Sequence, residues 1–168
     1  NYVKERMLFH GADPAALSVI ENFLTPERVD SSPRREPFQK SGIRKIAIVS
    51  RLDPIKRIDV LLDALDLAPA LKDLQFEIYG TGEDEQLLRS RALARKPNVR
   101  FMGFHPDIPL RVSQSDLLLH LCPEEPFGLA ILEAMAAHVP VLVPNSGGAG
   151  ALGVPGKTGV NFSANDAS

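Results

Sequence analysis

Short apolar runs alternate with amphipathic helical patterns along most of the chain. The runs cover 46–49, 75–79, 99–102, 117–121 and 139–143. In the segment after the first run, apolar residues recur three or four positions apart, as at Ile58, Leu61 and Leu65, which is typical of an amphipathic helix. A repeat of strand and helix every roughly 20–25 residues indicates βαβ units, and right-handed crossovers wind such units into a parallel sheet. We therefore expect an α/β fold with a doubly wound, Rossmann-like parallel sheet.

The first forty residues lack this alternation. Four prolines stand among clusters of charge there, which favours a connector over a core element. The short apolar piece at 17–24 packs either against the domain or against something outside this sequence. We expect a connector over 1–40 and one Rossmann-like domain over 41–168. The chain starts at Asn1 and ends in SANDAS, which looks like a capped helix start, so we expect a piece of a longer protein, truncated at its C-terminus.

Composition narrows the class of protein. The 168 residues are 44% hydrophobic and 24% charged, which is enough for one domain with a core. The net charge of -2 gives no overall attraction for nucleic acid or an acidic membrane. Cys122 is the only cysteine, so an internal disulfide and a CxxC metal knuckle are excluded, and a reducing compartment is favoured. No apolar run approaches the roughly 18–20 residues of a membrane-spanning helix. We expect a cytoplasmic protein with no nucleic-acid partner.

Ligands of such sheets bind at the carboxyl ends of the strands, so the segments after the strands are the place to search. These segments are 50–57, 80–82, 103–106, 123–128 and 145–148. Glycines and cations collect in them, as a phosphate-bearing ligand requires. The first segment contains Arg51 and Lys56. The Arg51 guanidinium presents a fork of hydrogen-bond donors, and the Lys56 ammonium is a point charge. The alternative, that both belong to a solvated helix start, stays open.

The segment around Pro126 predicts an anion-binding helix start. Proline suits the first position of a helix, where its missing N–H is no loss. The free amides of the first turn would then belong to Phe127, Gly128 and Leu129, and such amides bind anions together with the helix dipole. Gly128 also allows a ligand to approach closely.

Glu133 is the only charge between Leu129 and Ala137. An ionised group removed from water needs a partner, so either the helix turns Glu133 outward or a partner exists. Glu125 stands eight residues earlier, about 12 Å away if the segment is helical. Two acceptors on either side of an anion site would suit a ligand with hydroxyls on both sides of a phosphate, such as a nucleotide sugar. We therefore expect Arg51, Lys56, Glu125 and Glu133 to share one hollow at the rim of the sheet.

Several other residues favour a structural role. The turn Gly80-Thr81-Gly82 is a chain reversal or a candidate phosphate loop; Glu85 stands where a dinucleotide fingerprint has its third glycine. Gly147-Gly148 is interpreted as a flexible loop, His120 as a core histidine with satisfied hydrogen bonds, and Cys122 as a small buried residue.

Taken in order, these motifs resemble a known family. They are VSRLDPIK at 49–56, IYGTG at 78–82, NVRFMG at 98–103, Ser115-Asp116, the Glu125 and Glu133 pair in EPFGLAILEAMA, 140–143, and Gly147-Gly148. The set resembles the C-terminal, donor-binding domain of GT-B retaining glycosyltransferases of family 4, over roughly 43–162. The family's fold matches the Rossmann-like sheet expected from the pattern. The resemblance implies that 1–40 is an inter-domain connector and that 41–168 is a nucleotide-sugar-binding domain.

The resemblance implies a role for each matched position. Arg51 and Lys56 would hold the donor diphosphate, and Glu125 would lie near the transferred sugar; these three are the candidate catalytic residues. The candidate donor-binding residues are the amides of Phe127, Gly128 and Leu129 for the distal phosphate and sugar, Glu133 for the ribose diol, and the loop at Phe104 and His105 for the base. Gly80 and Gly82 remain the candidate phosphate loop.

The resemblance also implies an activity. The protein would be a hexosyltransferase of glycan biosynthesis that moves a sugar from a nucleoside diphosphate to a glycan or a lipid-linked sugar, with retention and without a metal or other cofactor. This domain would be inactive without an N-terminal domain of the same chain, and the full protein could lie peripherally at a membrane. Two alternatives stay open: a non-catalytic doubly wound interaction module, and a GT-B nucleotide-sugar epimerase.

Two positions depart from the family's pattern. Arg57 stands where a glycine usually follows the lysine, and the usual glutamate is missing after Gly147-Gly148.

Overall fold

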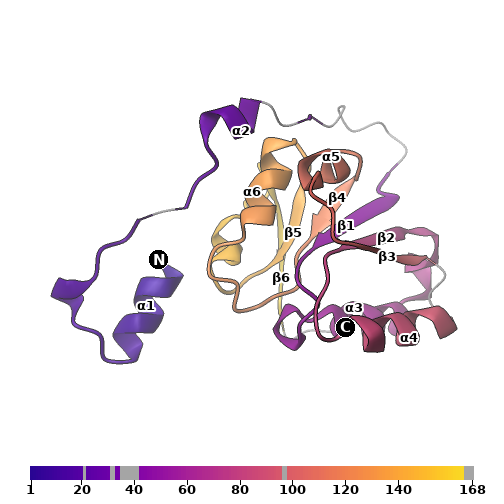
Figure 1. Ribbon diagram of the computed structural model, residues 1–168, viewed down its shortest axis with the longest axis horizontal. Helices are drawn as coiled ribbons and strands as arrows, with labels where there is room; N and C mark the ends of the chain where they lie inside the picture. Colours follow the sequence, from indigo (N-terminus) through magenta and orange to yellow (C-terminus); the bar gives the residue numbers. More distant parts are fainter. Residues whose placement is uncertain (21, 31–32, 35–41, 96–97, 165–168) are drawn as a thin grey trace.

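The protein folds around a parallel β-sheet. The computed structural model describes residues 1–20, 22–30, 33–34, 42–95 and 98–164. Within them, six strands form one sheet in the order β3-β2-β1-β4-β5-β6, and all paired neighbours are parallel (Figure 1). The strands are β1 (Lys45–Val49), β2 (Gln75–Tyr79), β3 (Val99–Gly103), β4 (Leu117–Leu119), β5 (Val141–Pro144) and β6 (Gly159–Phe162). The predicted doubly wound α/β fold is confirmed.

The central strand β1 explains why its sequence is a continuous apolar run. Ile46, Ala47 and Ile48 are all buried, because helices cover both faces of the sheet. Ile46 lies in register with Phe76 of β2 and with Leu117 of β4. A polar residue at any of these three positions would therefore face a core.

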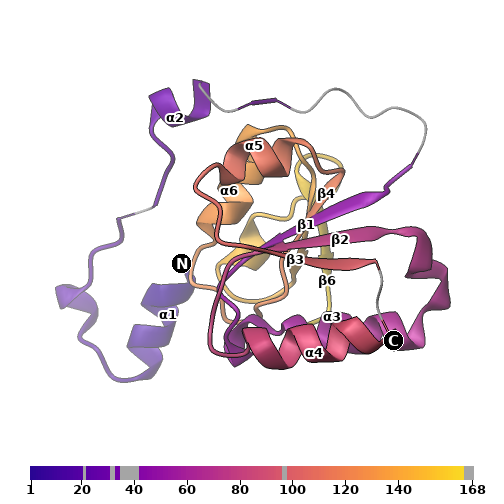
Figure 2. The ribbon, with the colours of Figure 1, turned by 45° about the vertical axis from the view of Figure 1, so that its right-hand side comes forward.

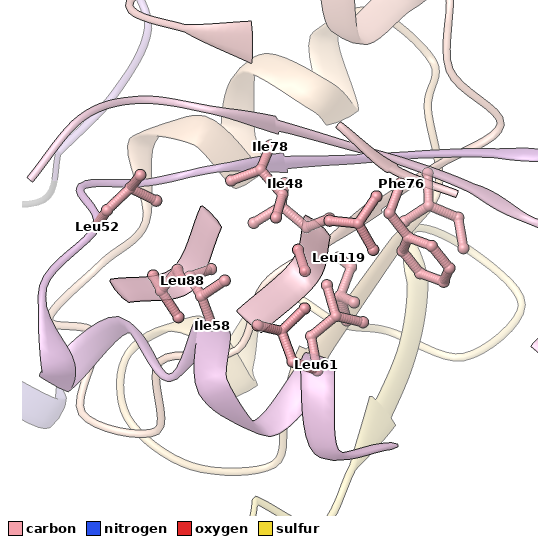
Figure 3. Close-up of a cluster of buried hydrophobic side chains, with 12 residues drawn as sticks. Ile48, Leu52, Ile58, Leu61, Phe76, Ile78, Leu88 and Leu119 are labelled. Atoms are coloured by element: carbon pink, nitrogen blue, oxygen red, sulfur yellow. The ribbon is translucent and has the colours of Figure 1, made fainter. Parts of the chain in front are cut away.

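The helices form a layer on each side of the sheet. One layer holds α3 (Ile58–Leu67) and α4 (Glu85–Arg95), and the other holds α5 (Ile108–Ser113) and α6 (Leu129–Ala136) (Figure 2). The labelled members of the core under α3 and α4 are Ile48, Leu52, Ile58, Leu61, Phe76, Ile78, Leu88 and Leu119 (Figure 3). Ala47, Tyr79, Ile131 and Val141 belong to the second core, between the sheet and α6.

Short 3₁₀ turns and an N-terminal segment complete the structure. The 3₁₀ turns are Pro14–Ala16, Pro54–Lys56, Pro69–Asp73 and Ala149–Ala151. The N-terminal segment contributes α1 (Tyr2–Phe9) and α2 (Pro26–Asp30), which lie beside the sheet and contribute no strand to it (Figure 1). No residue of α1 is buried. The division at residue 40 between connector and domain falls outside the described residues and stays a prediction.

Two features differ from the sequence prediction. β6 is not predicted, because Gly-Val-Asn-Phe is a short edge strand with Val160 56% exposed, and it lacks a buried apolar run. β4 ends at Leu119 and not at residue 121. None of the described helices has the length and apolar character needed to cross a bilayer.

Candidate functional site

The strand order places a topological switch point at the carboxyl end of the sheet. From β1 the chain proceeds to β2 and β3 on one side, then returns to β4 on the other side of β1. The loops after β1 and β4 therefore run apart, and ligands of open α/β sheets bind at this switch point. Here the Lys56 Nζ, from the β1 loop, donates to Glu125 Oε2, from the β4 loop, at 2.8 Å. The two side chains are only 17% and 15% exposed.

The Glu125 loop is held by the turn after β5. The Gly148 N–H donates to the Glu125 carbonyl oxygen at 2.7 Å, and Ser146 Oγ donates to the Pro123 carbonyl at 2.9 Å. Gly148 has no room for a side chain, because a Cβ there would lie 1.9 Å from the carbonyl oxygen of Pro126. Gly147 has φ +66, which glycine adopts readily. The turn is a tight support for the loop that carries Glu125, and the structure does not favour the alternative that Gly147-Gly148 is a flexible loop and nothing more.

Helix α6 begins later than predicted. Its first residue is Leu129, and Gly128 caps it with φ +93, a left-handed conformation that cannot continue back into a helix. Pro126 is therefore not the first residue of the helix, and of the three expected first-turn amides only that of Leu129 lies inside it. Glu133 is the fifth residue of α6, so it lies about one turn inside the helix, and Glu125 belongs to the preceding loop.

The charge on Glu125 depends on its neighbours. Burial raises the pKa of its carboxyl group, but the hydrogen bond and charge of Lys56, with smaller contributions from His120 and the Phe127 amide, bring that pKa below its ordinary value. Glu125 is therefore an ionised carboxylate at neutral pH.

His120 lies beside the same carboxylate. Its ring is 6% exposed, as predicted for a core histidine, but its Nε2 has no hydrogen-bond partner, so the expectation of a satisfied histidine is wrong. Nε2 lies 3.5 Å from Glu125 Oε2. Burial lowers the pKa of His120 to about 4, so the imidazole is neutral at neutral pH. Cys122 is buried as predicted, and its ligand atom and those of His120 and Glu125 lie within 4.8 Å of one another. Three such groups could hold a cation, although the Lys56 ammonium already supplies a positive charge there.

Arg51 lies at the other side of the switch point. Its Nη1 pairs with Asp53 Oδ2 at 2.8 Å, and its side chain is 74% exposed. It lines a cavity of about 310 Å³ together with several predicted site residues, among them Gly80, Phe104 and His105. Phe104 is 76% exposed, while the His105 ring packs edge-on against Tyr79.

The turn Gly80-Thr81-Gly82 packs tightly against the Arg51 loop. A Cβ at Gly80 would lie 1.9 Å from the Ser50 carbonyl oxygen, and the Leu52 N–H donates to the Thr81 carbonyl at 2.9 Å. These contacts account for both glycines as a chain reversal. Their role as a phosphate loop stays a prediction.

Glu133 has a partner within this chain. It is 8% exposed and forms an ion pair with Arg28 of α2, a helix of the N-terminal segment that lies near α6 (Figure 1). Burial raises the pKa of Glu133, and the charge of Arg28 and its hydrogen bond offset only part of that rise. A groove of about 660 Å³ opens on the same helix, lined by residues that include Val29, Phe127, Leu132 and Gly148.

The four charged residues expected in one hollow are distributed over three places. Arg51 lines the cavity beside β1, Lys56 and Glu125 pair across the switch point, and Glu133 faces Arg28. The sequence prediction gives no role to Arg28 or Asp53, and it does not place His120 beside Glu125. Asp53 could have been found, since it stands two residues from Arg51, but no local pattern indicates a contact between residues 105 positions apart.

Arg57 shows why glycine suits the position after the lysine. Its φ is +56, in the left-handed region, and its side chain approaches Asp59 at 3.8 Å.

Comparison with known proteins identifies the family. The family "Glycosyl transferases group 1" matches residues 32–168, which is most of the chain. The chain belongs to this family. It is also similar to individual glycosyltransferases: it is 32% identical to a phosphatidyl-myo-inositol mannosyltransferase of Mycobacterium leprae over 128 residues, which are 73% of this chain and 34% of that protein. It is 30% identical to a glycogen synthase of Mycobacterium tuberculosis over 166 residues, 93% of this chain and 38% of that protein.

Solved glycosyltransferase structures share the fold. Anabaena Alr3699/HepE in complex with UDP and glucose superimposes with a TM-score of 0.77 at 23% identity, over 98% of this chain and 48% of that one. A point mutant of S. aureus TarM, in complex with UDP and other ligands, gives a TM-score of 0.81 at 18% identity, over 99% of this chain and 33% of that one. This member of the group 1 family spans about a third of the length of the curated relatives named above.

Proposed function

We propose that this chain is the donor-binding domain of a retaining glycosyltransferase of the family 4 type, and that it binds a nucleoside-diphosphate sugar. The observation that carries the proposal is the contact of Lys56 with Glu125 across the switch point. A cation for phosphate and an acceptor for a hydroxyl meet there, where ligands of open α/β sheets bind.

Binding of the donor would exchange protein ion pairs for ion pairs with the ligand. Arg51 would leave Asp53, and Lys56 would leave Glu125, for the two phosphates. Glu125 would then accept a hydrogen bond from a hydroxyl of the sugar. Negative charge grows on the departing phosphate as the glycosidic bond breaks, and donors already aimed at it lower the barrier. Arg51, Lys56 and the start of α6 are the donors that this chain offers, and a metal is not required for this role.

Glu133 would bind the ribose diol without losing Arg28. A carboxylate has two oxygens with about four acceptor positions, and Arg28 uses Oε1. Oε2 is left for the ligand, and the charge of Arg28 offsets part of the rise in the pKa of Glu133 that burial causes. The base would lie in the cavity beside Phe104 and His105, where the exposed Phe104 ring offers a stacking surface.

The comparisons support a nucleotide-sugar donor but not its identity. Structural neighbours were solved with UDP or UDP-glucose, and relatives carry the names of mannosyl- and N-acetylglucosaminyltransferases. Because this chain spans only about a third of such proteins, we propose that sugar transfer requires a further N-terminal domain, which would supply the site for a glycan or lipid-linked acceptor.

One observation favours the second candidate, a non-catalytic interaction module. Glu133 is already paired with an arginine of this chain, so the ribose role is not needed to explain a buried carboxylate. The two candidates differ in whether a nucleotide binds.

Calorimetric titration with UDP, GDP, ADP and their sugar forms separates them. Under the proposal, the nucleotides of one base bind, and Glu133→Gln raises their Kd by about tenfold, which corresponds to the loss of a hydrogen bond to a charged group. Glu85→Gln is the matched control, because Glu85 pairs with Arg89 on α4, away from the switch point. The absence of binding by every nucleotide, or an equal effect of both substitutions, would contradict the proposal.

A further inference from the structure

His120 has no role in the donor-binding account. It follows β4, where its backbone N–H donates to the Leu142 carbonyl at 2.9 Å. Its ring is 6% exposed, and Nε2 faces Glu125 Oε2 at 3.5 Å without a hydrogen-bond partner. A buried polar atom without a hydrogen-bond partner destabilises the folded protein, and such atoms are few in native proteins and call for an explanation.

The carboxylate decides which ring nitrogen carries the proton. A neutral imidazole has one N–H, and the other nitrogen presents a lone pair. A lone pair on Nε2 would face an anionic oxygen and be repelled, whereas an N–H there is attracted. The Nε2–H tautomer is therefore the favoured one, and Oε2 of Glu125 has a donor from Lys56 on one side and a donor from His120 on the other.

We propose that His120 is a positioning residue that holds Oε2 of Glu125 and so reserves Oε1 for a hydroxyl of the donor sugar. This inference rests on the proposed function. Its physical basis is that Lys56 and His120 respond differently to a diphosphate. The Lys56 ammonium is drawn toward phosphate when the donor binds. His120 is neutral and buried and does not follow, so it keeps the carboxylate in place when Lys56 leaves.

Two other roles for His120 fit the structure less well. A general acid or base must reach the reacting atoms, whereas His120 is buried and its Nε2 faces a carboxylate. A cation held by His120, Cys122 and Glu125 would need the Nε2 lone pair, which is the opposite tautomer, and would meet the charge of Lys56. The position of the proton on His120 therefore separates positioning from metal binding.

The tautomer is measured on the whole chain by long-range ¹H–¹⁵N NMR of the histidine rings, with and without added Zn²⁺. We expect the proton of His120 on Nε2 in both samples. A proton on Nδ1, or its transfer there when zinc binds, would overturn the proposal.

A pair of substitutions tests the consequence for the sugar. The side-chain nitrogen of His120→Gln reaches the place of Nε2, whereas that of His120→Asn reaches only the place of Nδ1. The readout is the Kd of the nucleotide sugar relative to that of the nucleoside diphosphate, for UDP with UDP-glucose and for GDP with GDP-mannose. His120→Asn removes the N–H that faces Glu125 Oε2 at 3.5 Å. We take this attraction to equal the net value of a typical hydrogen bond, so the sugar form should bind about fivefold more weakly. The diphosphate should change less than about twofold, and His120→Gln should resemble the wild type.

The outcomes separate a structural role from positioning. Equal loss of both ligands, or identical behaviour of the two variants, would overturn positioning. If the wild type binds no nucleotide, the proposed function fails. The ¹³C titration of the Glu125 carboxyl then decides on positioning alone, since its pKa should rise in His120→Asn and not in His120→Gln. If His120→Asn does not fold, two measurements decide on positioning: the tautomer of His120 in the wild type, and the ¹³C titration of Glu125 in His120→Gln.

Discussion

Replacing Lys56 by methionine leaves Glu125 buried without its cation. Methionine keeps most of the apolar stem of lysine, so the change removes mainly the charge. Glu125 is 15% exposed and can escape the penalty by taking up a proton. At pH 7 protonation of a carboxyl with an ordinary pKa of 4.5 spans about 2.5 pH units at about 1.36 kcal/mol each, or about 3.4 kcal/mol. We therefore expect Lys56→Met to lower the free energy of unfolding by about 2–3 kcal/mol at pH 7.

The effect of pH on stability follows from the direction of the pKa shift of Glu125. The pKa of Glu125 is lowered in the folded protein, so its favourable contribution is present above the unfolded pKa and is lost as the pH falls through the folded pKa. In Lys56→Met the penalty requires an ionised carboxylate, so it should shrink to below about 1 kcal/mol at pH 5. Lys56→Met/Glu125→Gln should recover most of the loss, because neither charge remains.

Urea unfolding followed by far-ultraviolet circular dichroism measures these energies, since the chain has no tryptophan. The Glu125→Gln single variant completes the double-mutant cycle. A loss below about 0.5 kcal/mol at pH 7, a loss that does not shrink at pH 5, or additive effects in the cycle would show that the two side chains do not interact in solution.

Three further predictions test the support of the site. His138 follows the end of α6 with φ +58, and the Val139 N–H donates to the Ala134 carbonyl at 2.8 Å. A side chain is disfavoured at this φ and glycine is not, so His138→Gly should raise the free energy of unfolding, measured in urea, by about 0.5–1 kcal/mol. A loss of stability would contradict this. Gly148→Ala should cost about 3 kcal/mol in the same assay and weaken nucleotide binding, because its Cβ would overlap the Pro126 carbonyl. Gly156→Ala is the comparison variant: its Cβ would meet nothing within 4 Å, so it should cost only the strain of a side chain at φ +74, about 1 kcal/mol. A loss at Gly148 no larger than the loss at Gly156 would refute the support role. Arg28→Gln should raise the pKa of Glu133 further in a ¹³C titration and destabilise the protein only at a pH where Glu133 is ionised; an unchanged pKa would mean that the ion pair is not formed.

The sheet could be predicted from the sequence because its strands are buried on both faces. Apolar runs such as 46–49 are read directly, and the order of strand and helix fixes the parallel topology. The edge strand β6 was not predicted, because an edge residue such as Val160 is half exposed and the strand has no periodic pattern of buried apolar residues. The beginning of α6 was misplaced because Pro126 and Gly128 both fit a helix start, and only tertiary contacts of Gly148 with this loop decide between them.

The sequence predicted which residues belong to the candidate site, but not which of them contact each other. Lys56 and Glu125 were both named from the segments after their strands, but the sequence does not say that they contact each other over 69 positions. The sequence left open whether Glu133 turns outward or has a partner, and the structure buries it against Arg28 of α2. Contacts between loops depend on the three-dimensional path of the chain, which local patterns do not determine.

We propose that the switch point between β1 and β4 binds the diphosphate of a nucleotide. The most direct measurement is a titration of the ¹⁵N-labelled chain with UDP, GDP and ADP, followed through its backbone amides. One nucleotide should produce saturable shifts at Arg51, Lys56 and Leu129 together, with a Kd on the order of 1 mM or tighter, about −4 kcal/mol. Saturable shifts confined to other surfaces, or no saturable shift from any of the three, would contradict the account.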